Sequence, residues 1–137
     1  MKDRRPFALG TTVLASKTRG QIEELVTRHG ATSFATAGDG STARLLFECR
    51  GRRVRFEVVL ASGDDAENRR RWRCLHMVIK AKLEAVADGL SRFEDEFLAN
   101  TIIPGSSGET VSQWVGPQLE AAYSRGANMA PLLGDGR

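Results

Sequence analysis

Two clusters of arginine are the residues in this sequence best suited to binding phosphate. A planar guanidinium donates two parallel hydrogen bonds to phosphate oxygens and stays charged at neutral pH. One cluster falls in residues 44–55 and the other in residues 69–73. We predict that they merge into one positive surface that binds nucleic acid through phosphates. The predicted surface consists of Arg44, Arg50, Arg52, Arg53, Arg55, Arg69, Arg70, Arg73 and Lys80.

An ordinary solvated surface explains the same arginines, some of them paired with Glu48, Glu57 and Glu67. Exposed ion pairs contribute little to stability, so stability alone does not require this many. GC-rich coding also raises arginine content whatever the function. No side chain is identifiable as one that reads a base edge in a groove, so we predict binding without sequence readout.

Catalytic and metal-binding patterns are weak. Glu94, Asp95 and Glu96 are consecutive in a predicted helix, where neighbours point 100° apart and cannot all converge on one ion. The chain has two histidines and no Gly-Lys-Ser/Thr phosphate loop. Cys49 and Cys74 lie outside any CxxC motif and are predicted to be small buried thiols. We therefore predict no enzyme, no catalytic residue, no metal and no cofactor.

Charge is divided unevenly along the 137 residues. Residues 1–83 carry 17 Lys/Arg against 9 Asp/Glu, a net +8, whereas residues 84–137 carry 3 against 8, a net −5. The acidic end of one copy can therefore meet the basic end of another. This favours an alternative function, a protein–protein interaction module that forms a homodimer or binds a host or phage protein. Without a run of roughly 18 apolar residues, we expect no membrane partner.

The elements that must position these residues follow the order α-β-β-β-α. A capping box at Thr18 and Gln21 predicts a first helix that ends at His29-Gly30. Alternating apolar residues predict strands over 31–37, 42–50 and 53–60. A stripe that begins at Trp72 predicts a long helix over 65–87, with the indole in the core rather than stacked on a base.

The fold class expected from this pattern is α+β, with a three-stranded antiparallel meander packed on the long helix. A helical C-terminal extension is predicted to cover a remaining flank, with capping boxes at Ser91 and Thr110 and an extended crossing at 101–104. Gly116-Pro117 is expected to break or kink the last helix. We expect an extended N-terminal arm over 1–15, one domain over 16–127 and a tail over 128–137.

Several short stretches between residues 69 and 133 resemble a family of small uncharacterised proteins encoded by phages and prophages. They include Arg-Arg-Arg-Trp-Arg at 69–73, Phe-Glu-Asp-Glu-Phe-Leu-Ala at 93–99 and Met-Ala-Pro-Leu-Leu at 129–133. The resemblance implies a role in the cytoplasm of a bacterial host and supplies no functional residues. The element order is also similar to that of double-stranded-RNA-binding domains, which place a basic cluster at the start of their last helix.

Overall fold

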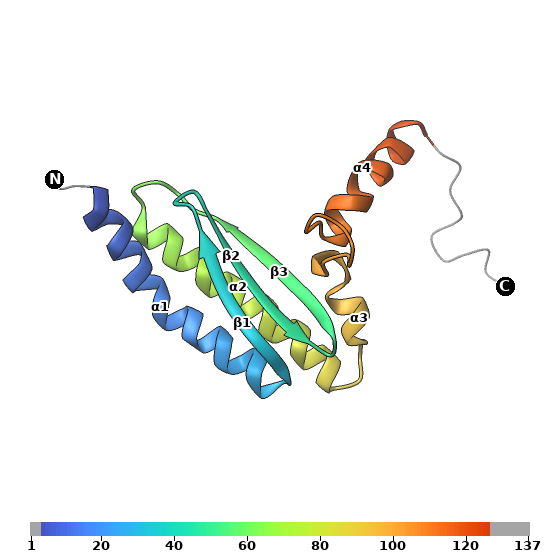
Figure 1. Ribbon diagram of the computed structural model, residues 1–137, viewed down its shortest axis with the longest axis horizontal. Helices are drawn as coiled ribbons and strands as arrows, with labels where there is room; N and C mark the ends of the chain where they lie inside the picture. The colour runs from blue at the N-terminus through green and yellow to red at the C-terminus, as the bar shows by residue number, and fades with distance from the viewer. Residues whose placement is uncertain (1–3, 127–137) are drawn as a thin grey trace.

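A helix, a three-stranded meander and a group of helices follow one another along the chain (Figure 1). The computed structural model describes residues 4–126, with side chains from residue 16 onward. The predicted α+β class and element order are confirmed. The elements are α1 (Arg4–Arg28), β1 (Ala31–Gly38), β2 (Thr42–Cys49), β3 (Arg52–Val59), α2 (Asp65–Ala87), α3 (Phe93–Glu96), the 3₁₀ turn η1 (Leu98–Asn100) and α4 (Val111–Ser124).

Two tight turns set the register of the antiparallel sheet, whose strand order is β1-β2-β3. At the first turn, the Asp39 carboxylate accepts hydrogen bonds from the backbone N–H groups of Ser41 and Thr42, both at 3.0 Å. These donors hold the pKa of Asp39 below its usual value. At the second turn, Arg50 and Gly51 have φ angles of 54° and 76°, the left-handed pair that a two-residue hairpin requires.

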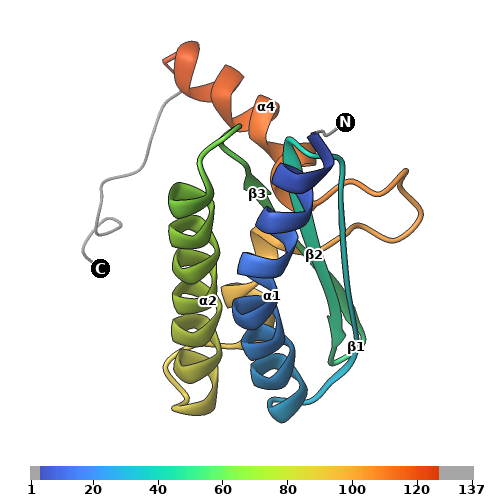
Figure 2. The same ribbon diagram turned by 90° about the vertical axis from the view of Figure 1, so that its left-hand side faces the viewer.

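The helices α1 and α2 lie side by side along one face of the sheet and run in the same direction (Figure 2). The alternation predicted for the second and third strands is confirmed from Leu45 to Cys49 and from Val54 to Val58, where every second residue is buried. Trp72 is 5% exposed, which confirms its place in the core. The core cluster comprises Ile22, Leu25, Val26, Leu45, Phe47, Cys49, Val54, Phe56, Val58, Trp72, Leu75, Ile79, Leu83, Phe93 and Phe97.

The short helix α3 closes one end of this core. The Phe97 ring meets the rings of Phe47 and Phe56 edge-on, with centroids 5.9 Å and 6.2 Å away. Phe93 lies 4.7 Å from Phe97, and both rings are 1% exposed or less. Edge-to-face aromatic pairs add to the favourable burial of their area. Two phenylalanines therefore attach a helix of four residues to the sheet.

The segment after α3 covers part of the free edge of β3. The Ile102 N–H donates to the Arg53 carbonyl at 2.8 Å, and the Asn100 amide donates to the Arg55 carbonyl at 3.1 Å. Thr101 forms an isolated antiparallel bridge with Val54. The extended crossing predicted at 101–104 is thus confirmed at Thr101 and Ile102, and its function in the fold is to pair a sheet edge.

Two predictions about helix starts are wrong. Residues 4–17 belong to α1 rather than to an extended arm, and Thr18 therefore lies inside the helix instead of capping it. Pro6 does not prevent this because it lies in the first turn, where backbone N–H groups lack intrahelical partners. Ser91 does not cap α3, which begins after Arg92 without a side-chain cap. The predicted tail over 128–137 lies outside the described residues.

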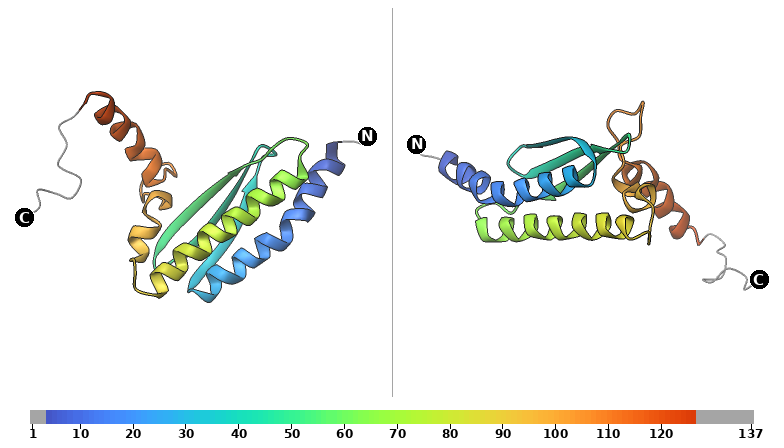
Figure 3. Two further views of the ribbon diagram at one scale, coloured as in Figure 1. Left: turned by 180° about the vertical axis from the view of Figure 1, so that it is seen from behind. Right: turned by 90° about the horizontal axis from the view of Figure 1, so that it is seen from below.

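The last helix, α4, begins at the predicted capping box. Thr110 Oγ1 accepts from the Gln113 N–H at 3.2 Å, and Gln113 Oε1 accepts from the Thr110 N–H at 3.0 Å. The helix passes through Pro117 without the predicted break. After its first turn it leads away from the sheet and from α2 (Figures 1 and 3). The prediction that the C-terminal helices cover a flank therefore holds for α3 but not for α4.

Candidate interaction site

The arginines at the β2–β3 turn and those at the start of α2 lie at opposite ends of the sheet and helix layers, while Arg44 lies opposite Glu57 on the sheet itself. At the β2–β3 turn, the Arg50 guanidinium lies 5.6 Å from the Phe93 ring centroid, and Arg52 pairs with Glu94 at 3.7 Å. The start of α2 instead faces the far end of β3, where Arg71 donates to the Val59 carbonyl. Seven strand residues separate these ends, a distance of about 23 Å. The structure thus does not bring the two clusters together into the predicted composite surface.

On the outer face of the sheet, arginines alternate with carboxylates. Arg44 lies opposite Glu57 and pairs with it at 3.2 Å, while Arg53 lies opposite Glu48. The Arg55 side chain is only 15% exposed, because its guanidinium donates to the Gly108 carbonyl at 2.8 Å and to Gln113 Oε1 at 2.9 Å. This face carries mixed charge, and Arg55 serves to attach the first turn of α4.

A basic stripe remains on α2. Arg69, Arg73 and Lys80 lie at helical spacing, and Arg73 and Lys80 are exposed. Arg70 belongs to a different cluster, since it donates to Glu67 at 2.8 Å and 2.9 Å. Within residues 16–126, no carboxylate forms an ion pair with any of the three stripe residues. Among residues 16–126, Arg50 and Arg53 are the other predicted phosphate-binding residues without an ion pair, but they lie near the β2–β3 turn, away from this stripe.

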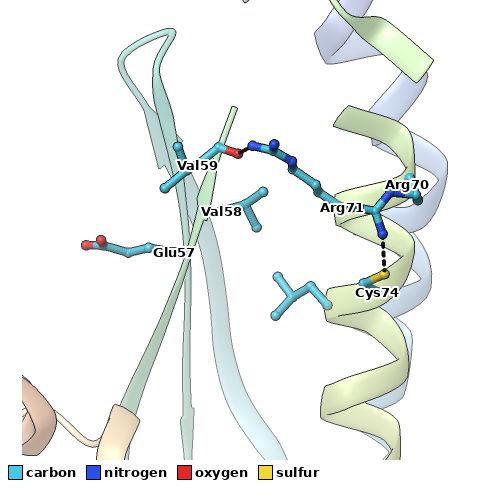
Figure 4. Close-up of a pocket in the computed structure, with 7 residues that line it drawn as sticks. Glu57, Val58, Val59, Arg70, Arg71 and Cys74 are labelled. Atoms are coloured by element: carbon cyan, nitrogen blue, oxygen red, sulfur yellow. Dashed lines mark hydrogen bonds between the residues drawn. The ribbon is translucent and has the colours of Figure 1, made fainter. Parts of the chain in front are cut away.

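An open hollow of about 400 Å³ separates the start of α2 from the end of β3 (Figure 4). Hydrogen bonds from Arg70 and Arg71 lower the pKa of Glu67 to about 2, and Glu67 raises the pKa of Arg70. Arg70 also contacts the Cys74 sulfur at 3.5 Å. The ion pairs of Glu67 lie within α2, and the hydrogen bond from Arg71 to the Val59 carbonyl links the start of this helix to β3. The lining of the hollow is Glu57, Val58, Val59, Arg70, Arg71, Cys74 and Leu75.

The two cysteines differ in exposure. Cys49 is buried, and burial raises the pKa of its thiol. Cys74 is exposed, so the prediction of a second buried thiol is wrong. The reason is its position on the flank of α2 that faces the hollow, one residue before the buried Leu75. The described residues contain no group of three or more His, Cys, Asp or Glu that could hold a metal ion.

The three consecutive acids of α3 each face a different cation. Glu94 pairs with Arg52 at 3.7 Å, Asp95 with Arg92 at 3.3 Å, and Glu96 with Lys82 at 3.7 Å. This divergence follows from the 100° rotation between neighbouring helical residues. These carboxylates therefore tie α3 to the hairpin and to α2.

An exposed apolar patch continues from the hollow along α2. We name it the α2 shelf, and it consists of Val59, Cys74, Met77, Val78 and Ala81. Met77 and Val59 are 67% and 65% exposed. Residues 74, 77, 78 and 81 share one side of the helix because they are spaced three or four apart. Arg70, at the same spacing before Cys74, lies at the end of the shelf.

A second exposed apolar patch covers about half the circumference of α4, counted at 100° per residue. We name it the α4 face, and it consists of Val111, Trp114, Val115, Leu119, Ala122 and Tyr123. Trp114, Leu119 and Tyr123 are 55%, 51% and 66% exposed. Sequence reasoning identified the helix but not its exposure, because periodicity indicates that a face is apolar without showing what covers it.

Comparisons with known proteins do not place the chain in a group. No family model, no curated protein and no solved structure matches it. Between residues 4 and 126, no helix combines the length and the apolar character needed to cross a bilayer.

Proposed function

We propose that this chain is a non-catalytic protein-interaction module that binds its partner through the α4 face. One observation supports the proposal: α4 is capped and apolar on one side, yet within the described chain none of its residues is buried. Removing apolar surface from water is favourable by about 25 cal/mol per Å². A contiguous exposed apolar patch of this kind is typical of a protein-binding site. From the resemblance to phage and prophage proteins, we further propose that the module acts in the cytoplasm of a bacterial host.

A photoreactive side chain tests this proposal in cells. We expect p-benzoylphenylalanine at position 123, on the α4 face, to form adducts with protein when bacteria that produce the chain are irradiated. The matched control is the same residue at Leu90, which is 82% exposed and lies outside α4. Adducts at 123 and none at 90 support the interaction module. Equal labelling at both positions, or none at 123, contradicts it.

Nucleic-acid binding is the second candidate, now confined to the basic stripe of α2. It is favoured by the lack of ion-pair partners for Arg69, Arg73 and Lys80 within residues 16–126. Phosphate contacts release counterions, so affinity falls steeply with salt. The α-β-β-β-α order adds no argument, because a fold alone does not define a function.

A mobility shift against single-stranded DNA, duplex DNA and duplex RNA tests the second candidate. We expect Arg73→Gln to weaken binding to all sequences alike. The slope of log affinity against log salt concentration should fall by about the amount that one phosphate contact contributes. Arg92→Gln is the control. Arg92 is exposed like Arg73, but it lies outside the stripe and its charge is paired with Asp95. A folded protein that shifts none of these probes at low salt would eliminate this candidate.

A further inference from the structure

Among residues 16–126, nothing covers the α2 shelf or the α4 face, which are two apolar surfaces of one chain. The shelf offers about two helical turns, from Cys74 to Ala81. The α4 face offers the same length from Val115 to Ala122. In its own chain, α4 leads away from α2 and from the sheet (Figures 1 and 3). Neither patch can thus cover the other within the fold as it stands.

From this we propose that the partner is a second copy of the chain, with α4 of each copy packed on the α2 shelf of the other. This inference rests on the proposed function and adds the partner and its docking site. The reciprocal exchange is closed under a twofold axis, so both patches of both copies are covered and no surface remains for further growth. Cys74, Met77 and Val78 then meet Val115, Leu119 and Ala122.

Charge favours the same arrangement. Arg73 and Lys80 flank the shelf on the exposed side of α2. Glu120 is the only charged residue within α4, and Glu109 precedes the helix; both are exposed. The net charges of +8 over residues 1–83 and −5 over residues 84–137 also attract the acidic part of one copy to the basic part of another. A rim of opposite charge around an apolar centre is the usual composition of a protein interface.

The native Cys74 provides a direct test, because it is exposed on the shelf while Cys49 is buried. We expect Ala122→Cys to form a disulfide with Cys74 of another copy under diamide, giving a covalent species of twice the 15.0 kDa chain. Ser124→Cys is the control, about 200° away around the helix, and should give little of that species. In a mixture of ¹⁵N-labelled and unlabelled chains, the disulfide between Cys74 and the cysteine introduced at position 122 should join one peptide of each label.

Mass measured by light scattering over a dilution series provides the second test. We expect Met77→Lys to raise the dimer dissociation constant about tenfold or more, because it places a charge in the centre of the contact. Leu90→Lys, outside both patches, should leave the constant unchanged. Both side chains are well exposed, so equal denaturation midpoints at monomer concentrations will confirm that the variants fold.

Three outcomes overturn the proposed dimer. They are a chain that stays monomeric, a dimer in which the Ala122→Cys variant forms no disulfide with Cys74, and a disulfide that joins only peptides of the same label. If the chain is monomeric but position 123 forms adducts with other proteins, the interaction module stands and only the choice of partner fails. A monomeric chain that also forms no adducts at position 123 contradicts both the dimer and the interaction module.

Discussion

The helices α3 and α4 differ in a way that their lengths do not predict. The four-residue α3 buries Phe93 almost completely, and Phe97, the residue that ends it, is 0% exposed. The fourteen-residue α4 has a complete capping box and an apolar face, yet buries none of its described residues. Capping and length stabilise a helix locally, whereas attachment to the fold depends on which side chains reach the core. The contrast separates a helix that completes this fold from one that is available to a partner.

The largest expected effect comes from removing the ring that attaches α3. Phe97→Ala should lower the free energy of unfolding by about 3–5 kcal/mol, because it empties a site between Phe47, Phe56 and Phe93. Chemical denaturation measures the change. Leu98→Ala is the control, since Leu98 is 52% exposed and should change stability little. An equal loss of stability in the two variants would mean that the Phe97 ring is not what attaches α3 to the core.

A smaller effect is expected from the ion pairs of Glu67 with Arg70 and Arg71 in the first turns of α2. The pKa of Glu67 is lowered from 4.5 to about 2, so its ion pairs stabilise the fold above pH 4.5 and are progressively lost as pH falls toward 2. Glu67→Gln should therefore be less stable than wild type near neutral pH, and the difference should shrink as pH falls through this window. Denaturation midpoints at several pH values measure it. A stability difference between wild type and Glu67→Gln that stays constant down to pH 2 would contradict the lowered pKa of Glu67.

The smallest effect on the monomer is expected in α4. Leu119→Ala should change the unfolding free energy by less than about 0.5 kcal/mol at concentrations where the chain is monomeric, because Leu119 is 51% exposed. The measurement is the same denaturation experiment. At higher concentration, the variant should lose the stability that association adds to wild type. A large loss at low concentration would mean that α4 belongs to the core after all.

Local patterns predicted most of the fold. Alternation along β2 and β3 predicted which residues are buried, and the Trp72 stripe predicted the buried side of α2. The start of α1 was missed because Pro6 breaks a helix interior but not a first turn. The lack of clear periodicity in residues 1–15 also favoured an extended arm.

The candidate site was harder to predict, because it depends on distances that sequence neighbours do not reveal. Arg55 and Arg69 are only fourteen residues apart, yet the first binds Gly108 and Gln113 while the second lies on α2. Glu57 and Glu48 lie opposite Arg44 and Arg53 because of the strand register. The two-residue turn at Arg50-Gly51 sets that register. The exposure of Met77 and Leu119 follows from the direction in which α4 leaves the sheet, and no local pattern encodes that direction.

The hydrogen bonds from Asn100 and Ile102 to β3 also have a consequence for synthesis on the ribosome. The chain reaches Val59 and can pair its three strands about forty residues before Ile102 exists. At roughly 5–20 residues per second, this leaves the β3 edge open for about 2–8 seconds in each nascent chain. An unpaired edge is a template for strands of neighbouring chains. A chain that ends between these points would keep this part of the β3 edge unpaired, so the segment after α3 also removes one site at which neighbouring nascent chains could associate.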